Sequence, residues 1–467
     1  MRPKRKVAQF TTIQKKFTTK EHAQRLSDCN FRFYLRFFKA LLHLSLTEDL
    51  AKLIVRYFPA TVHVLISKAA NMRLLHTSML KLKEFVGWEV PNYAILSHRW
   101  EDEEITFQDL QTYSFGECKD AILKKGWSKI RGCCEQGTKD GFDWVWIDSC
   151  CIDKTSSAEL TEAINSMFDW YRNANVCYAY LSDVPSTEHM HDHGKAGSAF
   201  RQSKWFTRGW TLQEFLAPGM LEFYDSQWEY TGSKAGMEEL LKEITGIRDL
   251  DNFDQACVAQ KISWASRRET TRVEDRAYSL MGLLGVNMPP LYGEGNKAFL
   301  RLQLELIKIS DDESIFAWLD ELTVSRLGRG LLATSPEAFE SSGDVYQLGF
   351  ENDRPAYSMT NKGLLMEAQF VSSSATGLPI QNPHNNDILL LPLQCMLRTE
   401  SSQGKGRIAV GLRHVEGDQY TRITSDQFIL MDREHQKKFE NDCQSQEGVR
   451  FHVKQRDQWD SCIGWCR

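Results

Sequence analysis

The stretch from Trp205 to Pro218 reads WFTRGWTLQEFLAP and combines several large apolar side chains with a few polar ones, among them Arg208 and Glu214. A surface helix would not gather so many apolar groups, and an ordinary core helix would need neither the arginine nor the glutamate. Trp210 and Glu214 are four residues apart, so on a helix they share one face. A carboxylate beside an indole interacts strongly with other charges because the surroundings are partly dry. The same residues also fit a second interpretation, a buried Arg208–Glu214 ion pair that anchors the helix.

Composition predicts a globular protein with a large core. The chain has 467 residues, of which 42% are hydrophobic and 25% charged, and its formal net charge is -5. This balance argues against a general nucleic-acid binder. The longest apolar run, at 53–70, is interrupted by charges and a proline, so we expect no stable membrane insertion. The twelve cysteines do not follow the spacing of a secreted disulfide framework, and we therefore expect reduced thiols in a cytoplasmic protein.

Residues 1–71 are expected to form an extension. The first twenty residues contain seven basic side chains and no acidic one, which fits a disordered tail or, alternatively, a targeting arm. Apolar residues at helical spacing then predict two or three helices up to about residue 70.

Residues 72–232 alternate short apolar runs with helical patterns. The expected strands are 93–98, 143–148, 176–181 and 220–225. The expected helices are 127–137, 156–173 and 205–215, the second with a capping box formed by Ser156 and Glu159. This alternation predicts an α/β fold, an open parallel sheet with flanking helices. Such sheets place their sites at the carboxyl ends of the strands, where reactive residue types are concentrated in this sequence.

Two further regions follow the α/β domain. Residues 233–318 have helical spacing and include a dense charge run at 269–276, which we expect to be a solvated or ion-paired helix start. Residues 319–467 contain short apolar runs separated by Gly, Ser, Asn and Pro, which predicts a β-rich domain without a catalytic constellation.

Some reactive side chains support only weak alternatives. Cys150 or Cys151 with His98 would suit a thiol hydrolase, but cysteines after a buried strand are usually small core residues. The adjacent pairs 133–134 and 150–151 lack the usual gap of a zinc site. Three alternating histidines at 189–193 are expected to lie in a solvated loop, so no metal site is predicted.

Three blocks of the chain resemble the HET (heterokaryon incompatibility) domain of filamentous fungi, most closely its vegetative incompatibility group. They read YAILSHRW at 93–100, WIDSCCID at 146–153 and RGWTLQE at 208–214, in the family's order and spacing. The likeness extends over about 72–318. It implies programmed cell death after fusion of genetically unlike cells, a self/non-self response resembling innate immunity. The implied partners are further copies of the chain or other HET/NOD-like signalling proteins, acting through homotypic assembly.

The HET fold is in turn similar to TIR domains, which implies a TIR/flavodoxin-like sheet. Residues 97–102 resemble the loop after the first TIR strand, and Trp210 to Glu214 resembles the TIR block in which a Trp precedes the catalytic Glu by four. By that match Glu214 is the candidate catalytic residue, while Ser97 and Arg99 would lie in the loop that touches the nucleotide.

This match gives an alternative function, cleavage of the nicotinamide–ribose bond of NAD. The reaction passes through an oxocarbenium-like state that one carboxylate can stabilise. NAD would be a substrate, and no cofactor is required. Arg99 or Arg208 would meet the pyrophosphate and Trp100 or Trp210 would stack on a ring. With Asp148 at the end of the second strand, these residues complete the predicted nucleotide site.

Overall fold

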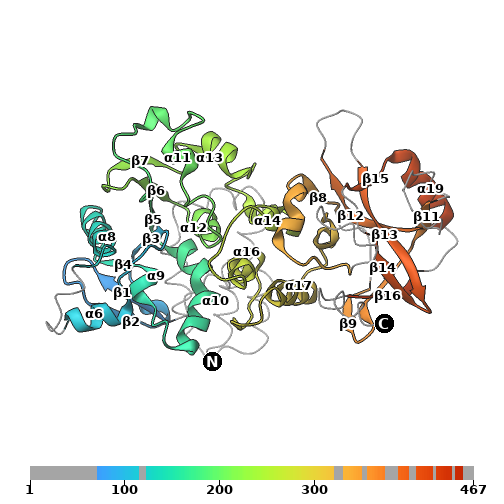
Figure 1. Ribbon diagram of the computed structural model, residues 1–467, viewed down its shortest axis with the longest axis horizontal. Coiled ribbons are helices and arrows are strands. Elements are labelled where there is room, and N and C mark those ends of the chain that lie inside the picture. The colour runs from blue at the N-terminus through green and yellow to red at the C-terminus, as the bar shows by residue number, and fades with distance from the viewer. Residues whose placement is uncertain are drawn as a thin grey trace, which may run out of the picture. The chain divides into compact units, whose positions relative to one another are not determined.

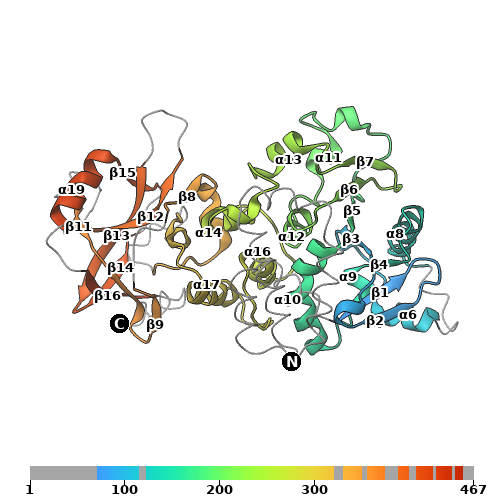
Figure 2. The same cartoon turned by 180° about the vertical axis from the view of Figure 1, so that it is seen from behind.

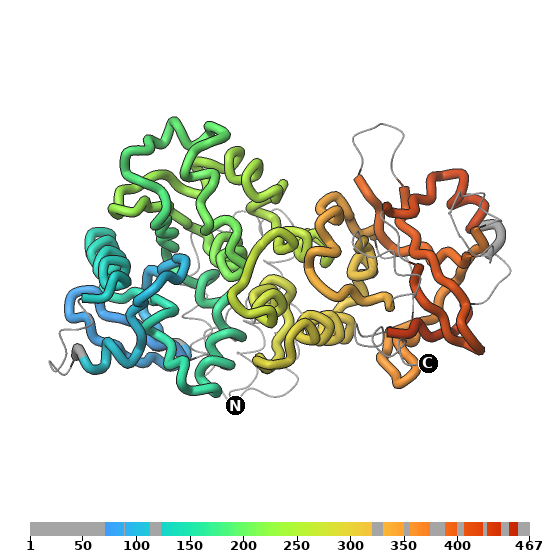
Figure 3. The backbone as a smooth tube through the Cα atoms, viewed as in Figure 1, coloured from blue at the N-terminus to red at the C-terminus, as the bar shows by residue number. Residues whose placement is uncertain are grey.

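The computed structural model describes residues 71–114, 123–319, 330–349, 355–373, 388–398, 406–423, 427–443 and 448–455, which Figure 3 draws in colour. The chain divides into two compact units, Met1–Ala69 and Ala70–Arg467. The predicted tail or targeting arm, and the helices expected before residue 70, lie outside the described residues.

The first sheet has seven strands in the order β2-β1-β4-β3-β5-β6-β7 (Figure 1). Their bounds are β1 Met72–His76, β2 Leu82–Phe85, β3 Ala94–His98, β4 Trp144–Trp146, β5 Val176–Tyr180, β6 Leu221–Tyr224 and β7 Tyr230–Ser233. All four expected strands are present, as β3 to β6, and they run parallel. The prediction of a parallel sheet throughout was wrong at both edges, because β1, β2 and β7 pair antiparallel.

Strands β3 and β5 are buried along their whole length, which explains their unbroken apolar sequences. They pair in register from Ala94 opposite Val176 to His98 opposite Tyr180. Across the sheet the four parallel strands lie in the order β4-β3-β5-β6, so the strand that comes second in the chain lies first, followed by the first, third and fourth. The chain thus goes from β3 to β4 on one side and then crosses to β5 on the other side of β3. The crevice between the ends of β3 and β5 is therefore the topological switch point, where ligands bind in such sheets.

Helices and short helical turns accompany this sheet. Their bounds are η1 Gly87–Glu89, α6 Phe107–Ser114, α8 Trp127–Lys139, α9 Asp148–Cys151, α10 Ser157–Asn173, η2 Met190–Asp192, α11 Ala199–Gln202 and α12 Thr211–Leu216. Half of the expected capping box is present at α10, where Ser156 accepts a hydrogen bond from the Glu159 amide at 3.3 Å. The Glu159 carboxylate bonds instead to the Asp153 amide at 2.7 Å and to Arg73 at 2.6 Å.

Helix α12 is shorter than the expected helix at 205–215. It begins at Thr211, and the Gly209 amide before it bonds to a distant segment instead of to a carbonyl of the preceding turn. The Gly209 amide donates to the Glu269 carbonyl at 2.8 Å, and the Glu269 amide donates to the Thr207 carbonyl at 2.7 Å. A side chain at Gly209 would place its Cβ 2.5 Å from Thr270 Cγ2, so this approach requires glycine.

The helical region follows as predicted, in shorter pieces. Its elements are α13 Glu238–Thr245, η3 Phe253–Gln255, α14 Val258–Ser263, α15 Asp275–Tyr278, α16 Met281–Leu284, α17 Lys297–Ile309 and η4 Glu313–Phe316, and a further short turn, η5 Pro336–Ser342, lies beyond its predicted end. Helices α10, α12 and α16 lie together in both views (Figure 1 and Figure 2). Helix α16 of the helical region thus packs against α10, and α10 in turn contacts α12 beside the switch point.

The β-rich prediction for the last part of the chain is confirmed by a second sheet, in the order β11-β12-β13-β14-β16-β10-β9, with β15 on β13 and β8 on β12. The strands are β8 Val345–Gln347, β9 Ser358–Thr360, β10 Gly363–Ala368, β11 Val371–Ser372, β12 Leu389–Leu397, β13 Gly406–Glu416, β14 Gln419–Arg422, β15 Ile429–Met431 and β16 Val449–Val453, with helix α19 Arg433–Cys443. The sheet is mainly antiparallel, as expected for strands separated by turn residues.

The contact between α16 and α10 gives a test of the packing. A Cβ added at Gly282 would lie 2.2 Å from Phe168 Cβ, so we expect Gly282→Ala to lower the free energy of unfolding by about 1–3 kcal/mol. The loss would occur although alanine favours helix more than glycine does. Gly219→Ala is the control, since nothing lies within 4 Å of its added Cβ. Chemical denaturation of both variants measures the effect, and equal stabilities would contradict the packing described.

Candidate functional site

Ser97 on β3 and Glu214 on α12 meet at the switch point of the first sheet. The Ser97 hydroxyl donates to Glu214 Oε2 at 2.5 Å, and the Trp205 indole N–H donates to the same hydroxyl at 2.8 Å. Ser97 is 0% and Glu214 7% exposed. Buried hydrogen bonds thus link Ser97 to two residues more than a hundred positions later in the sequence, the Trp205 indole and the Glu214 carboxylate.

Burial dominates the electrostatics of this carboxylate. Burial and, to a smaller extent, the Asp148 charge raise the pKa of Glu214, while Ser97, Tyr171 and Arg208 act in the opposite direction, and the net result is a pKa of about 8. Among the described residues, Glu214 has no cationic partner within 4.0 Å. The alternative of a direct Arg208–Glu214 ion pair was therefore wrong: Arg208 acts on Glu214 only through its field. A carboxyl group with this pKa exchanges its proton close to neutral pH.

Arg208 and Trp210 lie at the start of α12 and are half-buried. The Asp275 carboxylate accepts a hydrogen bond from the Tyr292 hydroxyl at 3.0 Å. Burial raises the pKa of Asp275, and Trp210 and Tyr292 oppose this shift. Trp210 therefore acts on a buried carboxylate of the helical region.

The loop after β3 holds a second polar cluster. His98 is buried, and its Nε2 lies 3.7 Å from Asp148 Oδ1 and 3.8 Å from Glu104 Oε2. Neither ring nitrogen has a hydrogen-bond partner, and burial lowers the pKa of His98. Lys129 closes the cluster, since its Nζ donates to Glu104 at 2.5 Å and to the Arg99 carbonyl at 3.0 Å. Arg99 itself is half-buried.

Trp100 lies at the surface of this loop and is 42% exposed. Its indole N–H donates to Asp148 Oδ2 at 2.8 Å. Lys154 Nζ lies 3.3 Å from the centroid of the Trp100 ring and 3.4 Å from the same carboxylate oxygen. The structure thus joins Trp100 to Asp148 and Ser97 to Glu214, and it adds Lys154, which the sequence did not single out as a site residue.

The charge run at 269–276 is not a solvated helix start at all its positions. Glu274 is buried and accepts the backbone N–H groups of Gly293 at 2.8 Å and Gly295 at 3.1 Å. Burial alone would raise the pKa of Glu274, but these N–H groups lower it overall. Both glycines have positive φ, 105° and 60°, so the turn presents its amides to one carboxylate. The prediction of a solvated or ion-paired helix start thus holds for Arg276, which pairs with Glu337 at the start of α15, whereas solvation was wrong for the buried Glu274 and Asp275.

The cysteines and histidines considered for a thiol hydrolase or a metal site lie either in the core or at the surface. Cys150 is buried, and burial raises its pKa well above that of a free thiol, which disfavours the nucleophilic thiolate. His193 is buried and stacks on Phe200 with ring centroids 4.4 Å apart, so the solvated-loop prediction fails for this histidine. His189 is exposed. Within the described ranges, no group of three His, Cys, Asp or Glu side chains is arranged to hold a metal ion.

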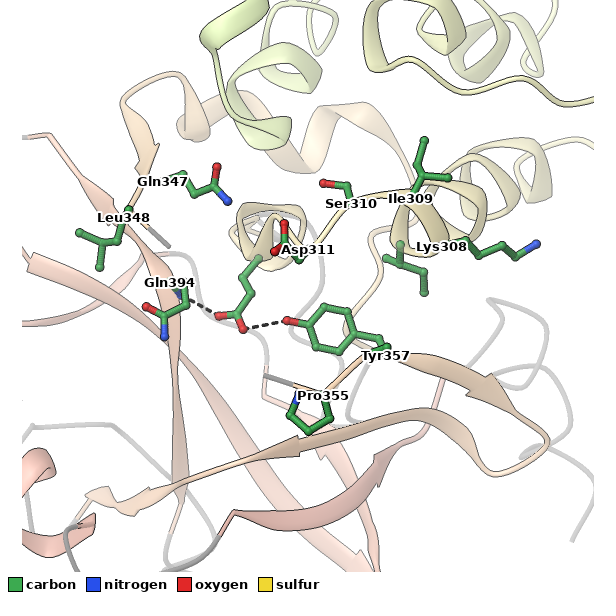
Figure 4. A pocket seen from close by; sticks show the side chains of 13 residues that line it. Lys308, Ile309, Ser310, Asp311, Gln347, Leu348, Pro355, Tyr357 and Gln394 are labelled. Carbon is green, nitrogen blue, oxygen red and sulfur yellow. Dashed lines mark hydrogen bonds between the residues drawn. The ribbon is translucent and has the colours of Figure 1, made fainter. Parts of the chain in front are cut away.

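A cavity lies elsewhere, beside the loop after α17. It has a volume of about 430 Å³ and is lined by α17 and its loop, the end of β8, the segment before β9 and Gln394 (Figure 4). In its lining, Glu313 accepts hydrogen bonds from the Tyr357 hydroxyl at 2.7 Å and from the backbone N–H of Gln394 at 2.6 Å. None of the predicted site residues lines this cavity. Glu214 itself is sealed by its neighbours, since it is only 7% exposed.

Comparison with known proteins finds a family likeness in the part of the chain that contains the β3 loop. The family model described as heterokaryon incompatibility protein (HET) matches residues 93–196. This segment is therefore similar to the HET family. The chain is also 41% identical, over 245 residues, to the vegetative incompatibility protein HET-E-1 of Podospora anserina. That match covers 50% of this chain but only 17% of the relative. No solved structure matched the chain significantly.

The matched HET segment contains only part of the predicted site. Ser97, Arg99, Trp100 and Asp148 lie inside residues 93–196, whereas Arg208, Trp210 and Glu214 lie beyond its end. The structure nevertheless brings Glu214 onto Ser97. In the part of the chain that is described, no helix is long and apolar enough to cross a membrane.

The raised pKa of Glu214 predicts a pH-dependent stability. Glu214 is protonated in the folded protein below about pH 8, whereas an unfolded glutamate ionises near pH 4.3. Its contribution to stability is therefore complete below about pH 4.3 and is lost as the pH rises toward 8, at a slope of up to about 1.4 kcal/mol per pH unit. Glu214→Gln should remove this slope in denaturation experiments between pH 5 and 8. Glu222→Gln, on the neighbouring strand β6, is the control, and a slope retained in Glu214→Gln would contradict the assignment.

Proposed function

We propose that this chain acts in heterokaryon (vegetative) incompatibility, as a self/non-self protein whose HET domain signals cell death. The family match and the 41% identity to a vegetative incompatibility protein support this proposal. The proposal is limited to the HET module, because most of the relative's length has no counterpart in the matched region.

For the mechanism, we infer that the HET domain signals by homotypic assembly. The observation that supports it most is the contrast between a sealed Glu214, 7% exposed, and Trp100, 42% exposed at the rim of the same sheet. Exposed tryptophans flanked by charges are common anchors of protein interfaces. Trp100 lies between Lys154 and Asp148, so the rim offers an aromatic ring with both charge signs beside it. Assembly needs no open cleft, which agrees with the closed switch point.

The strand order gives further support for a TIR/flavodoxin-like relationship. The parallel strands are arranged second, first, third and fourth, the start of the flavodoxin-like order. In this proposal, the added antiparallel strands β1, β2 and β7 are extensions of such a sheet at its two edges.

Replacement of the exposed indole tests the assembly mechanism. We expect Trp100→Ala to weaken self-association by about 30-fold, the effect of losing one strong interface anchor, and to weaken cell death in a host cell that expresses the chain. Tyr230→Ala is the matched control, because Tyr230 is 51% exposed but lies on β7, at the edge of the sheet. Sedimentation over a range of concentrations measures the association. Equal self-association of both variants and the unchanged chain would rule out this rim as the interface.

The second candidate function is hydrolysis of NAD to nicotinamide and ADP-ribose, and the Ser97–Glu214 contact at the switch point favours it. In the reaction the nicotinamide–ribose bond breaks, a water oxygen bonds to the ribose carbon, and the water proton is released. Ionised Glu214 would stabilise the positive charge that develops on the ribose, while Ser97 orients the carboxylate. Because Glu214 is sealed, the turn that carries Trp205 must open to admit the nucleotide.

The two mechanisms differ in what Glu214→Gln does. If the chain hydrolyses NAD, purified full-length protein should consume it, and Glu214→Gln should slow the loss by at least about 100-fold, with Glu222→Gln as the control. The rate of the unchanged protein should rise with pH as Glu214 ionises near pH 8. Loss of NAD that is unaffected by Glu214→Gln would end the enzymatic proposal. Cell death that persists in Glu214→Gln would support assembly alone.

A further inference from the structure

A segment of the helical region holds the turn that precedes α12. The backbone of Glu269 bonds to both Gly209 and Thr207, and Arg208 and Glu269 form a parallel β-bridge. These contacts join the β-sheet module to residues more than fifty positions later in the chain. They lie beyond residues 93–196, the segment that the family model covers.

Arg268 adds a buried guanidinium to this junction. It is 7% exposed, and its Nη1 donates to the Arg208 carbonyl at 3.0 Å and to Thr211 Oγ1 at 3.2 Å. Its Nε donates to the Trp264 carbonyl at 3.2 Å. Arg268 therefore ties together the last turn before α12 and the first residue of the helix that holds Glu214.

The charge of Arg268 has no direct ion-pair partner within 4.0 Å among the described residues. Burial lowers the pKa of Arg268 to about 9, and the acidic group that opposes this shift is Glu214. The guanidinium thus stays positive at neutral pH. A buried cation without a close partner is costly unless an acidic group balances it. Glu214, on the helix whose first residue Arg268 contacts, is the acid whose charge acts on Arg268.

We propose that Arg268 is a positioning residue for Glu214: it fixes the start of α12 through Arg208 and Thr211, and it supplies the positive charge that balances the ionised carboxylate. The inference rests on the proposed role of Glu214 in NAD hydrolysis, and it extends that site into the helical region. The titratable and charged groups that interact electrostatically with Glu214 are then Asp148, Tyr171, Cys177, Arg208 and Arg268.

Two substitutions separate the charge of Arg268 from its geometry. Arg268→Lys keeps the positive charge but loses the planar fork that reaches two acceptors at once. Arg268→Met keeps much of the side-chain bulk and removes the charge. Arg267→Met is the matched control, because Arg267 is the neighbouring arginine, its side chain is 82% exposed and it pairs with Glu340 on the surface.

The test follows the ionisation of Glu214 directly in the full chain. Protein with ¹³C-labelled glutamate carboxyl groups is titrated by NMR, and the Glu214 signal is the one that Glu214→Gln removes. We expect Arg268→Met to raise the midpoint of the Glu214 titration by at least about one pH unit, Arg268→Lys to raise it less, and Arg267→Met to leave it unchanged. The pH profile of NAD hydrolysis should shift in parallel.

The outcomes distinguish this inference from the enzymatic proposal. A Glu214 midpoint that is unchanged in folded Arg268→Met would overturn the inference. If Arg268→Met does not fold, as judged by near-ultraviolet circular dichroism, an unchanged midpoint in Arg268→Lys overturns it instead. A shifted midpoint in a chain that hydrolyses no NAD would support the positioning role and reject the enzymatic function.

Discussion

The bond between the Ser97 hydroxyl and the Glu214 carboxylate is the contact on which the rest of this molecule depends. It joins the first parallel strand to α12 at the switch point, and Trp205 fixes the hydroxyl from the other side. Because the carboxylate is buried, its neighbours decide whether it is charged. The strands bring the serine, the turn brings the indole, and the helical region holds the turn in place through Glu269 and Arg268.

The sequence predicted the elements whose signal is local. Short apolar runs identified all four parallel strands because β3 and β5 are buried along their whole length and β4 and β6 at all but one position. It did not predict β7, which reads YTGS and has no apolar run. It also placed the start of α12 six residues too early, since nothing in the local pattern shows that Gly209 pairs with Glu269. Contacts between distant segments produce no periodic pattern of apolar residues in the sequence.

The same distinction applies to the site. Residue types and the family resemblance selected Ser97 and Glu214, and the structure brings them into contact, although their catalytic role stays a prediction. Arg268 was not selected, because it stands in an ordinary basic pair before the charge run. Asp275 was noticed only as part of that run. Its burial against Trp210 depends on the turn at 291–295, which no local pattern reveals. Spacing identifies candidates, but only the tertiary structure shows which charges face each other.

The pairing of Gly209 with Glu269 also affects the order in which parts of the structure form during synthesis. A ribosome releases the strands and α12 well before it releases residue 269, so the nascent sheet exists for a time without the segment that fixes the turn at 205–210. The bonds of Thr207 and Gly209 to Glu269 can form only once that later segment has left the exit tunnel. A fragment that stops at the end of the first sheet would resemble this nascent stage rather than the finished domain.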